Sequence, residues 1–97
     1  MKAEKIYIVG AVTGVKNWEE KFKDAEWDVF CDNDVHVKIK TPRGYPKGLT
    51  QKEYMVLSCK SVFWADKIIV TKGWENSKGT MAEIALAESF GLPVKYL

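Results

Sequence analysis

The sequence predicts an α/β domain in which a parallel sheet of about four strands lies between layers of helices. Two apolar runs, residues 5–9 and 68–70, are continuous, and each leads into a glycine-containing loop. Such runs are typical of strands buried on both faces of a parallel sheet. Helical apolar patterns separate the strand-like runs, and right-handed crossovers then place helices on both faces. The expected architecture is a three-layer sandwich with strand order 2-1-3-4.

The first half of the chain has the pattern of a strand, a helix and an edge strand. After residues 5–9, apolar side chains recur at the spacing i, i+4, i+7 and i+11, which marks one stripe of a helix over about residues 17–30, with Asn17 as its cap. The stripe consists of Trp18, Phe22, Ala25 and Val29. Residues 35–40 alternate instead between apolar and polar side chains, so only one face is expected to be buried. We therefore expect this strand at an edge of the sheet.

The second half continues the alternation of helices and strands. Thr50 and Glu53 have the spacing of a capping box, which predicts a helix that starts after Thr50 and ends before Asp66. The strand at 68–70 is followed by a loop and by a helix from Met81 to about residue 90, which Gly91 ends. Residues 93–97 supply the last strand.

Length and composition restrict the class of protein. The chain of 97 residues is expected to form a single domain, residues 1–97. Its formal charge is +2 and its lysines are spread over the whole length, so no nucleic-acid polymer is expected as a partner. No membrane-spanning stretch or targeting segment is recognisable, which predicts a cytoplasmic protein. Cys31 and Cys59 lack metal-site spacing and are expected to be two buried, reduced thiols.

Residues 66–87 form the segment in which ligand chemistry is expected. A strand, a loop rich in small residues and a helix carrying Glu83 follow one another there. This order places backbone N–H groups, a hydroxyl and a carboxylate at the carboxyl end of a sheet, where open α/β folds bind ligands. The strand order makes the loops at Gly10 and Gly73 face each other across a crevice. Residues 10–14 lack the Walker A spacing, which disfavours nucleoside-triphosphate hydrolysis, and the pair of loops predicts a sugar-phosphate site.

Glu83 has two interpretations at this stage. Thr80 and Glu83 have the spacing of a capping box, in which the carboxylate would bind the Thr80 N–H and serve the helix start only. Alternatively, a carboxylate beside a glycine-rich crevice can attack the anomeric carbon of a sugar and form a covalent glycosyl ester. Tyr7 is similarly either a core residue or a hydroxyl that orients Glu83.

Three other features have weaker functional interpretations. Trp74 either stacks on a base or packs on the protein. His36, the only histidine, is expected on the solvent face of the edge strand, so neither a catalytic triad nor a metal site is expected. Residues 41–49, rich in proline and glycine, are a candidate lid over the crevice or a protein-binding loop.

Five blocks of the sequence, in their joint order, carry a resemblance to a known family. They are residues 7–14, 65–70, 73–80, 82–87 and 91–94, with the sequences YIVGAVTG, ADKIIV, GWENSKGT, AEIALA and GLPV. The chain resembles the nucleoside 2-deoxyribosyltransferase-like superfamily, especially its small, often phage-encoded branch, and it is also similar to deoxynucleoside 5′-monophosphate N-glycosidases. The resemblance implies a flavodoxin-like, Rossmann-like fold and homo-oligomers, with the family's nucleophilic glutamate at Glu83 and its catalytic tyrosine at Tyr7.

The same resemblance suggests the ligand and a departure from the family pattern. Where enzymes on free nucleosides carry an aspartate, this chain has Ser77, as the nucleotide N-glycosidases do, and a hydroxyl can receive a 5′-phosphate. Ser58 stands where the family has an aspartate that helps to bind and protonate the leaving base. The expected phosphate-binding residues are Gly10, Ala11, Val12, Thr13, Ser77 and Gly79.

Two functions therefore stay open from the sequence. The first is an N-glycosidic-bond hydrolase or transferase acting on 2′-deoxynucleosides or their 5′-monophosphates through Glu83, without a cofactor. The second is a non-catalytic nucleotide-binding or sensing domain, because Ser58 cannot supply the missing acid. In both, the partner is a small-molecule nucleoside or nucleotide, with Ser58 and Trp74 as further candidate binding residues.

Overall fold

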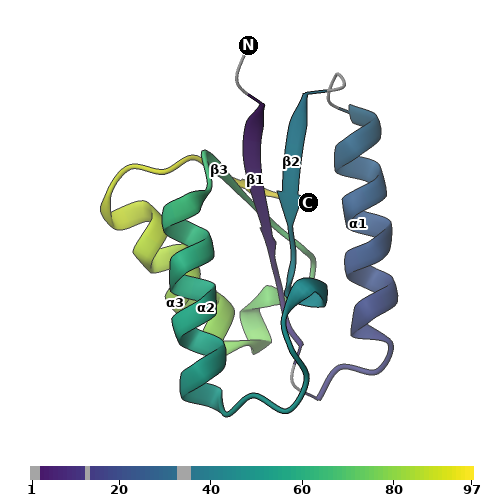
Figure 1. Cartoon of the computed structure of the whole chain (residues 1–97), viewed down its shortest axis with the longest axis vertical. Coiled ribbons are helices and arrows are strands. Elements are labelled where there is room, and N and C mark those ends of the chain that lie inside the picture. Colours follow the sequence, from purple (N-terminus) through teal and green to yellow (C-terminus); the bar gives the residue numbers. More distant parts are fainter. Residues whose placement is uncertain (1–2, 13, 33–35) are drawn as a thin grey trace.

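The computed structural model confirms the doubly wound α/β architecture. Its described residues, 3–12, 14–32 and 36–97, form a four-stranded parallel sheet and three α-helices (Figure 1). The strands are β1 (Glu4–Val9), β2 (Val37–Lys40), β3 (Lys67–Val70) and β4 (Val94–Tyr96), and the helices are α1 (Trp18–Asp32), α2 (Gln51–Trp64) and α3 (Lys78–Ser89). The strand order β2-β1-β3-β4 is the expected one, and all three strand pairs are parallel.

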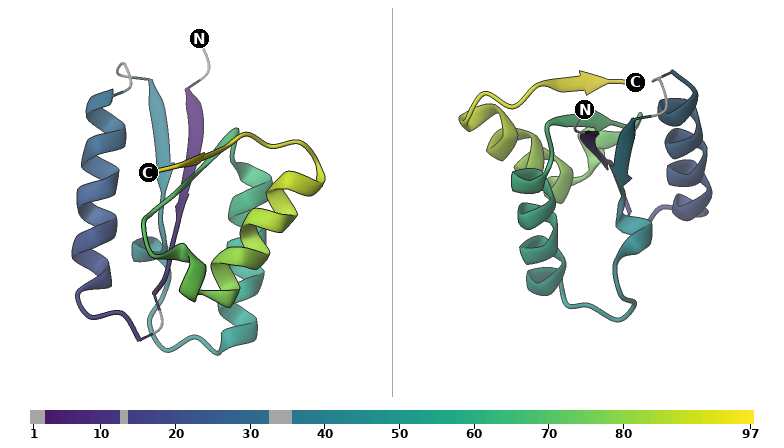
Figure 2. Two further views of the ribbon diagram at one scale, coloured as in Figure 1. Left: turned by 180° about the vertical axis from the view of Figure 1, so that it is seen from behind. Right: turned by 45° about the horizontal axis from the view of Figure 1, so that its top comes forward.

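Helices cover both faces of the sheet, as two apolar clusters show. Helix α1 lies on one face, and α2 and α3 lie on the other (Figures 1 and 2). Ile6 and Ile8 of β1 pack towards α1, in a cluster with Phe22, Ala25, Val29 and Ile69. Tyr7 and Val9 point the other way, into a cluster with Val62, Ala65, Ile68, Val70, Ile84 and Ala87. The alternation along β1 therefore places the Tyr7 side chain in the layer of α2 and α3.

Strand β2 is the expected edge strand. Val37 and Ile39 are half-buried against the α1 cluster, whereas His36, Lys38 and Lys40 are exposed. The Lys40 ammonium lies 4.6 Å from the centre of the Trp64 ring, so its charge rests on an aromatic face at the sheet edge. Val35, expected at the start of this strand, lies outside the described residues.

Several local expectations needed correction. Asn17 has a φ of 58°, which is left-handed rather than the extended conformation typical of an N-cap, and α1 continues to Asp32. Cys31 is exposed and Cys59 is half-buried, so the expectation of two buried thiols was wrong: Cys31 lies outside the buried stripe of α1 formed by Phe22, Ala25 and Val29, and Cys59 is not among the buried residues of α2. The capping box at Thr50 and Glu53 is confirmed, with both of its reciprocal hydrogen bonds present.

None of the helices within residues 3–12, 14–32 and 36–97 is long and apolar enough to cross a membrane.

Candidate functional site

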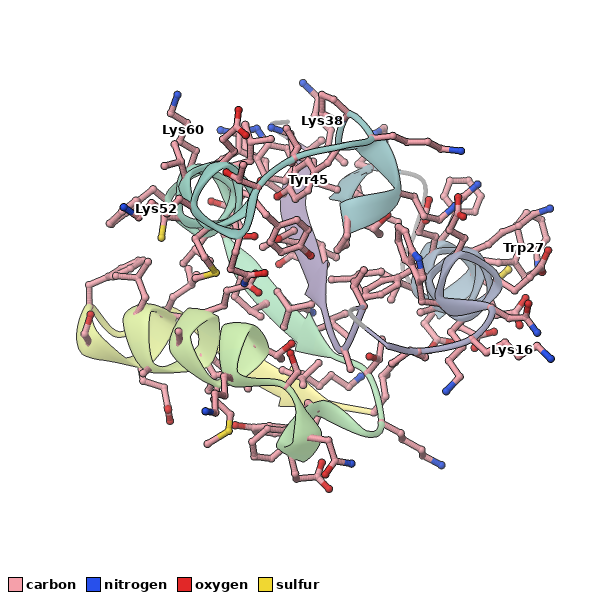
Figure 3. The ribbon with its side chains drawn as sticks, turned by 90° about the horizontal axis from the view of Figure 1, so that it is seen from below. Lys16, Trp27, Lys38, Tyr45, Lys52 and Lys60 are labelled. Atoms are coloured by element: carbon pink, nitrogen blue, oxygen red, sulfur yellow. The ribbon has the colours of Figure 1, made fainter. Side chains whose placement is uncertain are left out.

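The carboxyl ends of β1 and β3 open onto a cavity of about 280 Å³. The turn after β1, the start of α2 and the first turns of α3 form its walls, and Figure 3 looks onto this end of the sheet. The two loops expected to face each other do so through Gly10 and Val12 on one side and residues 76–80 on the other. Gly73, expected to face Gly10 across the crevice, is not part of the wall; it is the N-cap of the short 3-10 helix η2 (Trp74–Asn76) and has a left-handed conformation.

Gly10 is required by packing as well as by the cavity. A Cβ atom at this position would collide with the Thr71 side chain and lie 3.2 Å from the ring of Phe22. Thr71 approaches because its N–H donates to the Val9 carbonyl, 2.9 Å away, where β1 and β3 end side by side. Ala11 is half-buried beside this turn, and Thr13, expected to contact the phosphate, lies outside the described residues.

The first turn of α3 presents hydrogen-bond donors to the cavity. Ser77 is the N-cap, and its hydroxyl oxygen accepts bonds from the Thr80 N–H at 3.2 Å and from the Thr80 hydroxyl at 3.0 Å. With its oxygen used as an acceptor, Ser77 keeps its own proton for a further partner. The N–H groups of Lys78 and Gly79 belong to the first turn and have no acceptor within the helix. This end of α3 is therefore suited to an anion.

The capping-box interpretation of Glu83 is wrong. Helix α3 begins at Lys78, three residues earlier than expected, so Glu83 falls in the second turn, beyond the reach of the helix start. Two overlapping cap patterns, at Ser77 and at Thr80, compete in this sequence. Ser77 is the residue with the extended conformation of an N-cap, with a φ of −117° and a ψ of 109°.

Glu83 is a buried carboxyl group on the cavity wall. The residue is only 3% exposed, and its Oε2 atom has no hydrogen-bond partner among the described residues. Burial raises the pKa of Glu83 from 4.5 to about 7, and a hydrogen-bonding contact with Tyr7 opposes this rise. A carboxyl group with such a pKa exists in both protonation states near neutral pH, as reactive carboxyl groups often do.

Tyr7 reaches the same place from β1. Its side chain is fully buried, and burial, followed by the nearby charge of Glu83, raises its pKa strongly. The Tyr45 hydroxyl donates to the Tyr7 hydroxyl over 3.0 Å. Tyr7 therefore stays a neutral phenol that can donate its proton to Glu83.

Three of the described residues that were predicted to bind the ligand do not line the cavities, namely Ala11, Ser58 and Trp74. Ser58 of α2 is fully buried, and its hydroxyl has no well-formed hydrogen bond within the described residues, although the Tyr7, Tyr45 and Tyr54 side chains surround it. Trp74 packs against Tyr96, with 5.3 Å between the ring centres, and covers the end of the core instead of facing the crevice.

A second cavity of about 450 Å³ adjoins the first. The two share Val12, Gln51 and Tyr54 as wall residues. The wall of the second also includes Trp18 and Tyr45, so aromatic rings face it from two sides. Sequence reasoning missed Tyr45, Tyr54 and Gln51, because nothing in their local spacing marks them.

The loop expected to be a lid lines this second cavity and is tied to α1. Residues 41–50, here named the strap, include the short 3-10 helix η1 (Pro42–Gly44). Arg43 Nη1 lies 2.8 Å from Glu26 Oε2, and the Thr41 hydroxyl donates to the same oxygen over 3.0 Å. The strap is thus held at the side of the crevice by α1.

One family model matches nearly the whole chain. It is described as a domain of unknown function, DUF4406, and matches residues 4–96. The chain belongs to the DUF4406 family. The matched range of this DUF4406 domain runs from β1 to β4, and so it includes every residue placed on the walls of the two cavities. No curated protein matches the chain.

Metal-binding groups do not gather in the DUF4406 domain as far as it is described. Among residues 3–12, 14–32 and 36–97, no three histidine, cysteine, aspartate or glutamate side chains lie close enough together to hold a metal ion.

Proposed function

We propose that this DUF4406 domain cleaves the N-glycosidic bond of 2′-deoxynucleosides or their 5′-monophosphates, with Glu83 as the nucleophile. The observation that carries the proposal is the Glu83 carboxyl group, 3% exposed, with an unpartnered oxygen on the wall of a cavity. Leaving a buried polar atom unpaired costs free energy, so such an atom is expected to have a partner that is absent from the free protein. The resemblance to the nucleoside 2-deoxyribosyltransferase-like superfamily supports the same assignment.

The chemistry needs a carboxylate and a hydroxyl that directs it. In the proposed reaction, Glu83 attacks C1′ of the sugar while the bond from C1′ to the base nitrogen breaks, and the base leaves with the electron pair and gains a proton. Water then hydrolyses the glycosyl ester, or a second base takes its place. Tyr7 holds the carboxylate in line by donating its hydroxyl proton, and burial keeps Glu83 poorly solvated and therefore reactive.

The start of α3 favours the 5′-monophosphate over the free nucleoside. The Ser77 hydroxyl proton and the two free N–H groups of Lys78 and Gly79 converge at a helix N-terminus, and Lys78 adds a positive charge to the wall. No carboxylate occupies the position of Ser77 to repel a phosphate.

The second cavity is suited to the base. It adjoins the first at Tyr54, so a ligand with its sugar at Glu83 extends its base towards Trp18 and Tyr45. Aromatic side chains bind the flat face of a base by stacking. Glu19 contributes a carboxyl group to the same wall and is a candidate for protonating the departing base.

A second function, nucleotide binding without turnover, is favoured by Ser58. Its buried hydroxyl lies behind the tyrosine side chains and cannot replace a general acid, which contributes about 10²–10⁴ in rate in other enzymes. If Glu19 does not supply the proton either, the same two cavities make a binding or sensing domain.

Base release tests the two functions against each other. The protein is incubated with the four deoxynucleosides and their 5′-monophosphates, and free base is measured by chromatography, with Glu83→Gln in parallel. Base released by the parent and lost in Glu83→Gln supports the enzyme. Equal release by both refutes the nucleophile. No release, together with saturable nucleotide binding in calorimetry, supports the binding domain.

Ser77→Asp tests whether the start of α3 binds the 5′-phosphate. Aspartate and serine are about equally good N-caps, so the fold is expected to persist, whereas the added charge repels a phosphate. We expect the preference for 5′-monophosphates over nucleosides to fall at least about tenfold, which corresponds to about 1.4 kcal/mol. An unchanged preference would place the phosphate elsewhere.

A further inference from the structure

Tyr45 lies where the strap meets α2 and β1. Figure 3 shows it at the carboxyl end of the sheet, between α2 and β2. Its ring meets the Tyr54 ring edge-on, with 5.5 Å between their centres. Its hydroxyl has three oxygen partners within reach, namely Tyr7 Oη at 3.0 Å, Ser61 Oγ at 2.6 Å and the Leu57 carbonyl at 3.3 Å.

Proton counting restricts how these four oxygens can bond. A tyrosine hydroxyl has one proton, so Tyr45 donates to one partner at a time. When Ser61 donates to Tyr45, Tyr45 can donate to Tyr7, and the Tyr7 proton is then available for the Glu83 carboxylate. When Tyr45 donates to the Leu57 carbonyl instead, Tyr7 can donate back to Tyr45, and a carboxylate at Glu83 loses its donor.

The two arrangements suit the two protonation states of Glu83. An ionised Glu83 is stabilised by the first, because a bond to a charged acceptor is about twice as strong as a neutral one. A protonated Glu83 is suited to the second arrangement. Its carboxyl proton can be donated to Tyr7, Tyr7 then donates to Tyr45, and Tyr45 donates to the Leu57 carbonyl.

We infer that Tyr45 is a positioning residue, which aims the Tyr7 hydroxyl at the Glu83 carboxylate and so links the strap to the nucleophile. The inference rests on the proposed function of Glu83. Tyr45 also lines the second cavity, so a ligand held there contacts the same side chain that orders the chain of hydroxyls.

The surroundings of Glu83 are mostly phenolic. Tyr7 faces it from β1, Tyr45 from the strap and Tyr54 from α2, and Lys78 stands on the wall of the same cavity. The negative charge of Glu83 raises the pKa of Tyr45 and of Tyr54, secondary to the effect of burial on each. Removing the Tyr45 hydroxyl leaves Tyr7 without its donor, which makes Tyr7 a weaker donor to Glu83.

The test is an NMR titration of Glu83 in the free, full chain. Glutamate is labelled at the carboxyl carbon, and the Glu83 signal is assigned by its loss in Glu83→Gln. In Tyr45→Phe we expect the pKa of Glu83 to rise by about 0.1–0.7 pH unit, because Tyr7 keeps its proton for Glu83 but loses the roughly 10–30% that its own donor adds to a charge-assisted hydrogen bond. Ser61→Ala, which removes the outer link only, is expected to produce a smaller rise. Tyr54→Phe, which removes a neighbouring hydroxyl outside the chain, is the matched control.

Each outcome decides the role of Tyr45. A rise in Tyr45→Phe that exceeds the change in Tyr54→Phe supports the inference, and an equal or absent change overturns it. If Tyr45→Phe does not fold, the change in the Glu83 pKa in Ser61→Ala is compared with the change in Tyr54→Phe instead. A larger rise in Ser61→Ala supports the inference, and an equal or absent change overturns it. Base release is measured separately, so its absence counts against the proposed reaction while the titration still reports on the positioning of the carboxyl group. If base is released, the acidic limb of its pH profile is expected to shift with the pKa.

Discussion

Replacing Glu83 by glutamine is expected to make the protein more stable, and more so as the pH rises. The buried carboxyl group resists ionisation, and its pKa is raised from 4.5 to about 7 by burial. An unfolded chain ionises this group at its ordinary pKa, so ionisation favours unfolding. Glutamine has nearly the same shape but no charge, and the variant lacks this penalty.

The magnitude follows from the two pKa values. Below about pH 4.5 Glu83 is protonated in both the folded and the unfolded protein, so it makes no pH-dependent contribution to the free energy of unfolding. Between pH 4.5 and about 7 the folded protein binds more protons than the unfolded chain, so the stability of the parent falls as the pH rises. Above about pH 7 the penalty is complete and amounts to about 3 kcal/mol. That is a large part of the 5–15 kcal/mol typical of a small domain.

The assay is urea unfolding followed by tryptophan fluorescence from pH 4 to pH 8, since the chain has four tryptophans. The measured quantity is the difference in unfolding free energy between Glu83→Gln and the parent. The amide has a pH-independent cost of its own, so the change of this difference with pH is the test. Glu88→Gln, on the exposed side of the same helix, is the control and should show a constant difference. If the difference for Glu83→Gln varies by less than about 0.5 kcal/mol between pH 4 and pH 8, burial does not raise the pKa of Glu83 as expected.

Three further outcomes are expected. Gly10→Ala should lower the unfolding free energy by about 1–3 kcal/mol because its Cβ collides with Thr71, whereas Gly79→Ala, whose Cβ meets atoms no closer than 3.7 Å, should raise it by about 0.5–1 kcal/mol. Chemical denaturation checks both, and a destabilised Gly79→Ala would contradict the packing. Ser77→Ala should cost about 1 kcal/mol while Ser77→Asp costs little, and equal losses would mean that Ser77 is not the cap. Finally, we expect a homodimer or larger assembly at tens of micromolar in light scattering. Phe63, 64% exposed, stacks on the ring of Phe90, which follows the last residue of α3 and is 46% exposed, so Phe63→Lys is the variant to compare, and a monomeric parent would refute the assembly.

The order of the strands and the layers could be predicted from the sequence alone. The continuous run at residues 5–9 requires a strand covered on both faces, and the alternation at 37–40 requires an edge. Hydrophobic periodicity is a property of the local sequence, so it is visible without the tertiary structure. Together with right-handed crossovers, this periodicity leaves few possible strand orders, and the observed order is one of them.

The chemistry of the site was decided by the tertiary structure. The capping-box spacing of Thr80 and Glu83 predicted a start of α3 after Thr80, and only the packed helix, capped by Ser77, shows Glu83 to be buried beside Tyr7. Tyr45 meets a hydroxyl that lies 38 residues earlier in the chain, and no local pattern encodes that contact. Periodicity determines which face of an element is buried. Which side chains of that face meet across the core depends on the rotation and translation of α2 and α3 on the sheet, which the packing of the whole domain sets.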